Sequence, residues 1–173
     1  DPAIMAWQLA NEPRPLGNVD AYLRWIDGAA TLIRSLDCHH MVNLGSEGDT
    51  PWPSYVHTDL ARDHRLMDYV GVHVWPQNWN WYDPRGETEG KSLDDAWQKA
   101  SAYMLTSLSE AATLGKPMVV EEFGIARDGA SYEASAPTRH RDDFYLRMCT
   151  TLAARRSEGA AGLSFWAWGG EGR

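Results

Sequence analysis

Short apolar runs alternate along this chain with longer segments in which apolar residues recur every three or four positions. A short apolar run bounded by turn residues is typical of a buried strand, whereas the longer spacing is typical of a helix that buries one face. The runs predict five strands, at residues 3–9, 41–44, 69–75, 118–122 and 162–168. The longer segments predict four helices, at residues 19–36, around 56–63, from 92 up to a glycine at 115, and about 138–156.

Residues that commonly begin or end helices stand at the edges of these segments. Asn18 precedes the first helix as an N-cap, and Ser92 with Asp95 three residues later forms a capping-box pattern. Gly115 is expected to end the helix that Ser92 opens, and Gly159 is expected to end the last helix. Glycine suits both places because it readily adopts the left-handed conformation that follows a helix.

Strict alternation of strands and helices predicts an α/β fold with a parallel sheet and right-handed crossover connections. Such a sheet is either doubly wound or part of a (β/α)8 TIM barrel. Residues suited to chemistry follow all five predicted strands, which favours the barrel, since a doubly wound sheet gathers its site at one switch point. Five strands do not close an eight-stranded barrel. We therefore expect residues 1–173 to be the C-terminal portion of a single catalytic domain, an incomplete barrel without its N-terminal segment.

The composition narrows the class of protein. Of the 173 residues, 43% are hydrophobic and 23% are charged, as in an ordinary globular domain with a core. The formal net charge of -8 and the lack of a long Lys/Arg cluster argue against a nucleic-acid partner. No apolar run reaches the length of a membrane span, so no membrane partner is expected.

Two of the apolar runs end in a carboxylate. Glu12 follows the first predicted strand and Glu122 ends the fourth, 110 positions later. A charge at the end of a buried strand is costly unless it has a purpose, so the pair indicates acid–base or nucleophilic work on one substrate. A barrel rim brings strand ends together from such distances. Alternation along the strand sends Glu121 and Glu122 to opposite faces, so only one of them is expected to enter the barrel.

Tryptophan is the unusual residue of the composition. The chain has nine, and six of them lie at strand ends or in the loops that follow, where flat aromatic faces would line a cleft. These six are Trp52, Trp75, Trp79, Trp81, Trp166 and Trp168. For the last two, a place in the core is the alternative.

Five short motifs follow the predicted strands in order. They are Asn11-Glu12-Pro13-Arg14, Gly45-Ser46-Glu47-Gly48, His73-Val74-Trp75-Pro76-Gln77-Asn78-Trp79, Glu122-Phe123-Gly124 and Phe165-Trp166-Ala167-Trp168-Gly169-Gly170. Together they resemble glycoside hydrolase family 5, and within it the endo-β-1,4-mannanases. The resemblance covers essentially the whole chain and aligns it with strands four to eight of that family's barrel.

The resemblance implies a retaining endo-glycoside hydrolase that cleaves β-1,4-linkages in mannan, glucomannan or galactomannan. Glu12 would be the acid/base, and Glu122, which directly precedes the aromatic residue of its motif, would be the nucleophile. Such a double displacement needs two carboxyl groups ~5–5.5 Å apart. The resemblance implies no metal and no organic cofactor. It also implies substrate-binding roles for Asn11, Arg14, Glu47, His73, Trp75, Trp79, Trp81 and Trp166.

One position departs from the family pattern. Many members carry a tyrosine two residues after the histidine of strand six, and here that position is Trp75. Its indole N–H, or the hydroxyl of Tyr82, is expected to support Glu122. Pro13 is expected to hold Glu12 in an extended conformation.

Several alternatives stay open. Glu47 could be only a turn residue, and Arg14 could form only a surface ion pair. A β-1,4-glucanase of the same family shares both carboxylates, and a non-catalytic carbohydrate-binding relative would keep the fold. A polysaccharide substrate implies an extracellular or periplasmic location.

Overall fold

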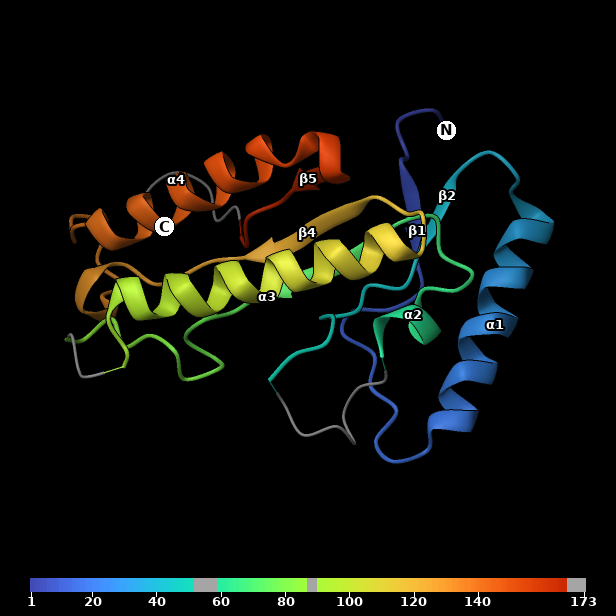
Figure 1. Cartoon of the computed structure of the whole chain (residues 1–173), viewed down its shortest axis with the longest axis horizontal. Helices are drawn as coiled ribbons and strands as arrows, with labels where there is room; N and C mark the ends of the chain where they lie inside the picture. Colours follow the sequence, from blue (N-terminus) through green and yellow to red (C-terminus); the bar gives the residue numbers. More distant parts are fainter. Residues whose placement is uncertain (52–58, 87–89, 168–173) are drawn as a thin grey trace.

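The computed structural model describes residues 1–51, 59–86 and 90–167. Within them, five strands alternate with four α-helices (Figure 1). The strands are β1 (Ala6–Gln8), β2 (Met41–Asn43), β3 (Val70–Val74), β4 (Met118–Phe123) and β5 (Ala160–Leu163). The α-helices are α1 (Val19–Leu36), α2 (Leu60–Asp63), α3 (Leu93–Thr113) and α4 (Arg139–Ala154). Two short 3-10 helices, η2 (Asp128–Ala130) and η3 (Arg156–Glu158), complete the described elements.

The strands form two parallel ladders, β1–β2 and β3–β4–β5. The ladders meet where β2 lies beside β3. The amide of Asp68 donates to the carbonyl of Val42 at 2.9 Å, and the amide of His73 donates to the carbonyl of Glu47 at 3.0 Å. The five strands therefore follow one another in chain order, all parallel, as strict alternation predicted.

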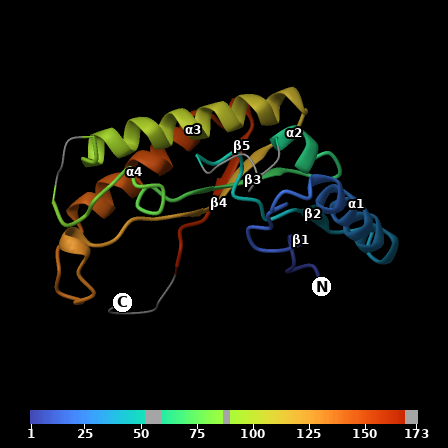
Figure 2. The same cartoon turned by 90° about the horizontal axis from the view of Figure 1, so that it is seen from below.

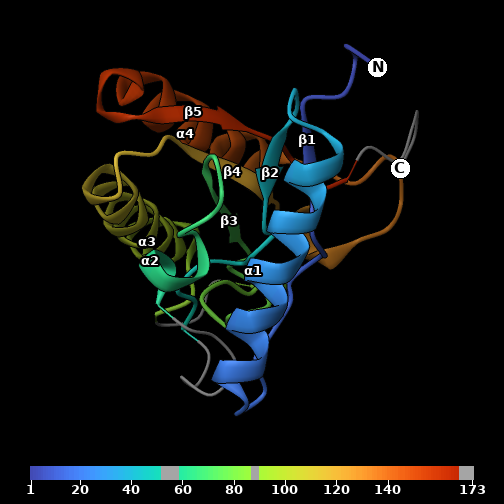
Figure 3. The same ribbon diagram turned by 90° about the vertical axis from the view of Figure 1, so that its right-hand side faces the viewer.

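The helices cover one face of each ladder. Figure 2 shows α3 and α4 on the same side of β3, β4 and β5, and Figure 3 shows α1 beside β1 and β2. The larger core joins Val72 and Val120 on the strands to Met104 on α3 and Phe144 on α4, all fully buried. A second core lies under α1 and consists of Tyr22, Ile26, Ala30, Val42, Leu44 and Met67. None of the described helices combines the length and the apolarity needed to cross a bilayer.

The predicted helix boundaries at Asn18, Ser92 and Gly115 are confirmed. The side chain of Asn18 accepts a hydrogen bond from the third amide of α1 at 3.2 Å. Ser92 and Asp95 form a complete capping box at the start of α3. Gly115 follows α3 with φ +67, which lets the chain turn toward β4.

Other boundaries differ from the predictions. α4 ends at Ala154, and Gly159, at φ +106, ends the 3-10 helix η3 instead of α4. β5 begins at Ala160, two residues earlier than predicted, because its ladder with β4 starts there. It also stops at Leu163, although Ser164 and Trp166 still donate to carbonyls of β4. Part of the predicted helix at 56–63 falls on residues 52–58, which lie outside the described residues, and α2 covers its end.

Candidate active site

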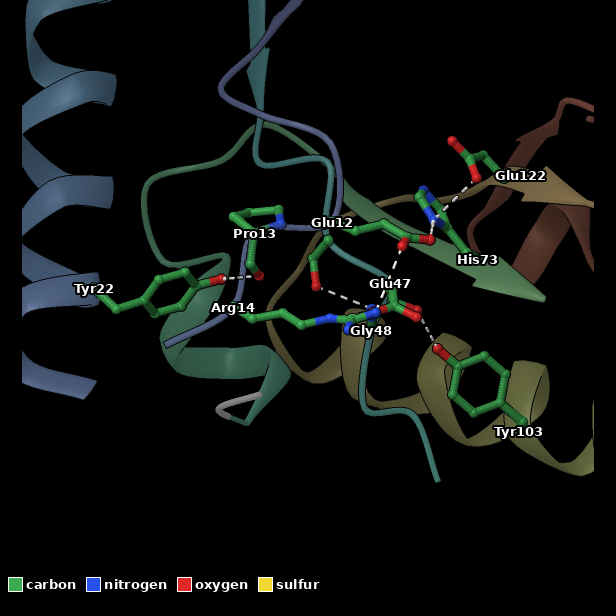
Figure 4. A network of polar contacts seen from close by, with 10 residues as sticks. Glu12, Pro13, Arg14, Tyr22, Glu47, Gly48, His73, Tyr103 and Glu122 are labelled. Atoms are coloured by element: carbon green, nitrogen blue, oxygen red, sulfur yellow. Dashed lines mark hydrogen bonds and ion pairs between the residues drawn. The ribbon is translucent and has the colours of Figure 1, made fainter. Parts of the chain in front are cut away.

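Three side chains from three strand ends meet at the carboxyl edge of the sheet (Figure 4). Nδ1 of His73 lies 2.8 Å from Oε1 of Glu12 and 3.4 Å from Oε2 of Glu122. One oxygen of each carboxylate and the ring nitrogen all lie within 4.8 Å of one another. The His73 side chain is 1% exposed, Glu12 is 25% exposed and Glu122 is 13% exposed, so the group is largely shielded from water. Asn11 is exposed next to Glu12.

Glu12 reaches this place through an unusual backbone conformation. Its φ is +47, and its amide donates to the carbonyl of Gly45 at 2.8 Å. Gly45 itself has φ +79, and a Cβ there would lie 1.9 Å from the carbonyl oxygen of Ala10, so this loop requires glycine. The expectation that Pro13 holds Glu12 extended is therefore wrong. Contacts with the loop after β2 override the local preference, at a strain of roughly 1–3 kcal/mol that is typical of functional sites.

Glu122 is placed by a bulge in β4. The pairing of β3 with β4 shifts by one residue, so that Glu122 pairs with His73 and Glu121 is an extra residue. Val120 before the bulge and Phe123 after it are both buried in the helix-covered core. The expectation that Glu121 and Glu122 lie on opposite faces is therefore wrong, because an extra residue interrupts the alternation and leaves both carboxylates on the face away from the helices.

Glu121 is the centre of a second polar cluster that sequence reasoning did not find. Its carboxylate accepts hydrogen bonds from Asn43 Nδ2 at 2.5 Å, from the Tyr69 hydroxyl at 3.1 Å and from Gln8 Nε2 at 3.2 Å. Burial is the main cause that raises the pKa of Glu121 above its usual value. A Cβ at Gly71 would lie 2.1 Å from Glu121 Oε2, so the glycine makes room for this carboxylate. The signal in the sequence was one polar residue in each of three strands, Gln8 in β1, Asn43 in β2 and Glu121 in β4.

A third polar contact joins the loops after β1 and β2. The Arg14 guanidinium donates two hydrogen bonds to Glu47 Oε1, from Nε at 2.9 Å and from Nη2. Nη2 of Arg14 also lies 3.6 Å from Glu12 Oε2 (Figure 4). Glu47 is buried, and its carbonyl accepts from the Tyr103 hydroxyl at 2.5 Å and from the His73 amide at 3.0 Å. Buried Glu47 is therefore more than a turn residue, because it pairs with Arg14 and accepts the His73 amide. Arg14 forms the expected ion pair with its side chain 38% exposed, and it also approaches Glu12.

The tryptophans divide into core and rim residues. Trp79 is 6% exposed and packs edge-on against Trp81 at 4.8 Å and Tyr103 at 5.1 Å between ring centroids. The expectation that Trp79 binds substrate is therefore wrong, because Trp79 is part of the core. The half-buried Trp81 packs beside it. The Trp79 indole nitrogen is buried and has no hydrogen-bond partner among the described residues. Trp52 and Trp168 lie outside the described residues.

Trp75 and Trp166 remain available to a ligand. Together they line a small pocket of about 130 Å³ beside Gly124, two residues after Glu122, and Trp166 is 57% exposed. The buried hydroxyl of Tyr82 bonds His140 Nδ1 at 2.9 Å. Support of Glu122 by Tyr82 stays a prediction, and the contact found at Glu122 is that of His73, whose Nδ1 lies 3.4 Å from Oε2.

The cluster of Glu12, His73 and Glu122 has the donor set that a divalent cation uses, with one ligand atom from each residue. The same atoms already contact one another, since His73 Nδ1 lies within ion-pair distance of both carboxylates. As drawn in Figure 4, the arrangement is a carboxylate pair held by a buried imidazole. Such a pair suits acid–base and nucleophilic chemistry on one bond.

Paired carboxylates at the carboxyl edge of consecutive parallel strands, with helices on the far side, define a site of the β/α-barrel type. A family model described as "GH family 5 beta-mannosidase-like" matches residues 1–173. The chain therefore belongs to the β-mannosidase-like proteins of glycoside hydrolase family 5.

Individual relatives agree with this assignment. The chain is 28% identical over 196 residues to "Mannan endo-1,4-beta-mannosidase 2" of Oryza sativa subsp. japonica, covering 99% of this chain and 41% of that protein. It is 33% identical over 180 residues to "Probable mannan endo-1,4-beta-mannosidase F" of Emericella nidulans, covering 97% of this chain and 35% of that protein. The chain thus spans well under half the length of these relatives.

A solved structure has the same fold. A variant of the glycoside hydrolase family 5 mannosidase from Rhizomucor miehei, in complex with mannosyl-fructose, superposes with a TM-score of 0.85 at 32% identity. The match covers 99% of this chain and 41% of that one. The predicted (β/α)8-barrel class, of which this chain forms an incomplete part, is confirmed.

Proposed function

We propose that this chain supplies the two catalytic carboxylates of a retaining glycoside hydrolase that cleaves β-1,4-linkages in mannan, glucomannan or galactomannan. The observation that carries the proposal is the approach of Glu12 and Glu122, whose nearest ligand oxygens lie within 4.8 Å. Retaining enzymes hold their carboxyl groups ~5–5.5 Å apart, whereas inverting enzymes leave ~6.5–9.5 Å for a water molecule. The spacing favours attack by a carboxylate over attack by water.

The proposed reaction has two steps. Glu122 attacks the anomeric carbon while protonated Glu12 gives its proton to the departing glycosidic oxygen, which leaves a glycosyl ester on Glu122. Ionised Glu12 then takes a proton from water, the water oxygen attacks the same carbon, and the Glu122 carboxylate is released. One glycosidic bond and one water are consumed, and configuration at the anomeric carbon is retained.

The surrounding side chains support this division of roles. Buried His73 contacts both carboxylates and keeps them at a short separation while substrate binds. Arg14 lies 3.6 Å from Glu12, so its positive charge stabilises the carboxylate that Glu12 becomes after it donates its proton. Glu47 holds the guanidinium in place from the other side.

The mannan preference and the domain assignment rest on the relatives. Proteins described as mannan endo-1,4-beta-mannosidases match 96–99% of this chain. We place residues 1–173 in the C-terminal portion of one (β/α)8 catalytic domain. The experiments below therefore use the protein expressed from the coding region together with its upstream extension.

The direct test compares the reducing ends released from galactomannan and from soluble cellulose. Release from galactomannan, with the β-anomer formed first in the proton NMR spectrum, is the expected result. Release mainly from cellulose would support the proposed mechanism but identify β-1,4-glucan as the substrate. Formation of the α-anomer first would contradict the retaining mechanism. Binding to mannan without turnover would favour a non-catalytic carbohydrate-binding protein.

A second candidate is an exo-acting β-mannosidase with the same two carboxylates. The family description and the mannosidase with a TM-score of 0.85 favour it. Chromatography of early products from mannohexaose separates the two. An endo-acting enzyme cuts inner linkages and gives oligosaccharides of mixed length, whereas an exo-acting enzyme gives only mannose and mannopentaose at first.

A further inference from the structure

A cationic cavity lies beyond the paired carboxylates. It has a volume of about 600 Å³ and lies between the loop after β3 and the loop after β4. The two loops occupy the same end of the molecule, on the left in Figure 1. Its lining includes three arginines together with amide, hydroxyl and aromatic groups, namely Arg85, Arg127, Arg141, Gln77, Ser131 and Tyr132.

The walls of this cavity are held together by bonds between the two loops. The Gly129 amide donates to the Pro84 carbonyl at 2.7 Å, and the Ala126 amide donates to Gln77 Oε1 at 2.5 Å. Ala130, which lines the cavity, has φ +55. This left-handed backbone conformation is unfavourable for any residue other than glycine. The bonds between the loops fix Gln77 and Pro84 relative to residues 126–129 before a ligand binds, which lowers the cost of ordering for these residues.

The charges of the three arginines are not balanced within the lining. No Asp or Glu is among the described residues that line the cavity, and within the described part of the chain none of the three arginines has a carboxylate within 4.0 Å. Arg127 donates from Nη1 to the Ala136 carbonyl at 3.2 Å, which leaves its other N–H groups for a ligand.

Three described acids lie in the adjoining loops, Asp83, Asp128 and Glu133, and none of them lines the cavity. Asp83 accepts from the Arg85 amide at 3.0 Å, and Asp128 accepts from the His140 amide at 3.2 Å. The chain as a whole has a formal charge of -8, so three arginines around one cavity run against its general charge. Such a cluster favours an anionic ligand.

The cavity is continuous with the candidate active site. Gln77 and Ala126 line both this cavity and the small pocket of Trp75 and Trp166. A chain of sugar rings that passes over that pocket, away from Glu122, reaches the arginines next. The cavity therefore lies where a more distant sugar of the same substrate would bind.

We propose that this cavity binds the carboxylate of an acidic sugar unit carried by the polysaccharide substrate, at some distance from the bond that is cleaved. A guanidinium group binds a planar carboxylate through two parallel hydrogen bonds, which a neutral sugar cannot offer. Exposed Tyr132 adds an aromatic face for the same ring. The inference rests on the proposed glycosidase function and adds a substrate class to it.

The test measures binding by calorimetry, in a Glu122→Gln background so that the substrate is not consumed. The probes are a mannan oligosaccharide that carries one glucuronic acid substituent and the neutral oligosaccharide of the same length. The acidic probe is expected to bind about tenfold more tightly, the order of one charge-assisted pair. Arg127→Gln/Arg141→Gln should remove this difference and leave the affinity for the neutral probe within about twofold.

The matched control is Arg24→Gln/Arg156→Gln, which removes the same charge at exposed positions outside the cavity and should keep the preference. Equal affinity for the two probes, or an equal loss for both in the Arg127/Arg141 variant, would overturn the inference. Free glucuronate or inorganic phosphate that binds as tightly as the acidic oligosaccharide would also overturn it, since the site would then hold a free anion.

Failure of this inference is distinguishable from failure of the proposed function. If the wild-type protein releases no reducing ends but binds the acidic probe through the arginines, the proposed reaction is contradicted and the proposed binding of an acidic sugar stands. If the wild-type protein cleaves mannan but shows no preference for the acidic probe, the proposed reaction stands and the proposed binding of an acidic sugar is contradicted.

Discussion

The β1–β2 ladder and the β3–β4–β5 ladder each contribute one candidate catalytic carboxylate, but they hold it in different ways. Glu122 belongs to β4, where a bulge between two core residues sets its direction. Glu12 belongs to a loop after β1, at φ +47, and its position depends on contacts with Gly45, His73 and Arg14. The backbone of a strand therefore holds Glu122, whereas the backbone carbonyl of Gly45 and the side chains of His73 and Arg14 hold Glu12.

The boundary between the ladders consequently carries the geometry of the site. His73 lies on β3, yet its closest carboxylate contact is Glu12 of the other ladder, at 2.8 Å. Glu121 on β4 likewise bonds Gln8 and Asn43 of the other ladder. Each of the following changes tests one side of this comparison or the boundary itself, in the full-length protein.

Glu122→Gln should cause the largest loss. Removing the nucleophile abolishes the covalent step, so kcat on mannan should fall by a factor on the order of 10^4 or more, as for other activated nucleophiles. An aryl mannoside with a good leaving group should be affected just as strongly. Stopped assays on both substrates, with binding checked by calorimetry, measure this. Residual turnover above about one per cent would sink the nucleophile assignment.

Glu12→Gln should cause a smaller and substrate-dependent loss. General acid catalysis contributes roughly 10²–10⁴-fold, so kcat/KM on mannan should fall by that factor. An aryl mannoside with a good leaving group needs little protonation, so formation of its glycosyl enzyme should be nearly unchanged. A burst of released phenol followed by slow turnover would show this split. An equal loss on both substrates would contradict the acid/base role.

Substitution of Glu121 tests the boundary between the ladders. Glu121→Leu leaves Asn43 and Tyr69 without their acceptor, so the free energy of unfolding should drop by about 3 kcal/mol. Glu121→Gln keeps an acceptor oxygen and should cost about 1 kcal/mol or less. Urea denaturation of both variants measures the difference, and kcat at 25 °C shows whether the bulge still presents Glu122. Wild-type stability in both variants would mean that the cluster contributes nothing.

Asp63 in α2 gives a smaller effect that depends on pH. Burial, and then the charge of Asp59, raise its pKa to about 7. Between its unfolded pKa of about 3.9 and pH 7 the folded protein holds the extra proton, so this group makes stability fall as pH rises through that window. Asp63→Asn removes the effect and should be more stable than wild type by ~2 kcal/mol at pH 8, with little difference at pH 3.5.

Thermal melts of Asp63→Asn at several pH values, beside the exposed control Asp20→Asn, check this. His64 has its pKa lowered to about 4 by burial, which makes stability rise with pH between about 4 and its unfolded value. That slope is present in both proteins and cancels in the difference. A difference that does not depend on pH would contradict the assignment to Asp63.

The local signals in the sequence were sufficient for the alternation of elements and for most helix boundaries. Asn18, Ser92 and Gly115 act through bonds or backbone angles within a few residues, so a single stretch of chain specifies them. The identity of Glu12, His73 and Glu122 as candidates also came from short motifs. Their meeting at one edge follows from the parallel order of the strands.

What failed were the statements about direction and exposure of single side chains. The opposite faces expected for Glu121 and Glu122, the extended Glu12 and the exposed Trp79 each assumed that local geometry continues unchanged. Pairing with β3 alters the alternation at Glu121 and Glu122, and the loop after β2 alters the backbone of Glu12. Tyr103 packs on Trp79. Each of these partners lies far away in the sequence.

The order of elements, the helix caps and the chemical groups at the strand ends were therefore contained in the linear chain, because hydrophobic periodicity and capping act over a few residues. The bulge in β4, the left-handed Glu12 and the cluster of Glu121, Asn43, Gln8 and Tyr69 arose only when the strands were packed side by side. Register and hydrogen bonding between distant segments depend on the whole sheet, and no single stretch of sequence specifies them.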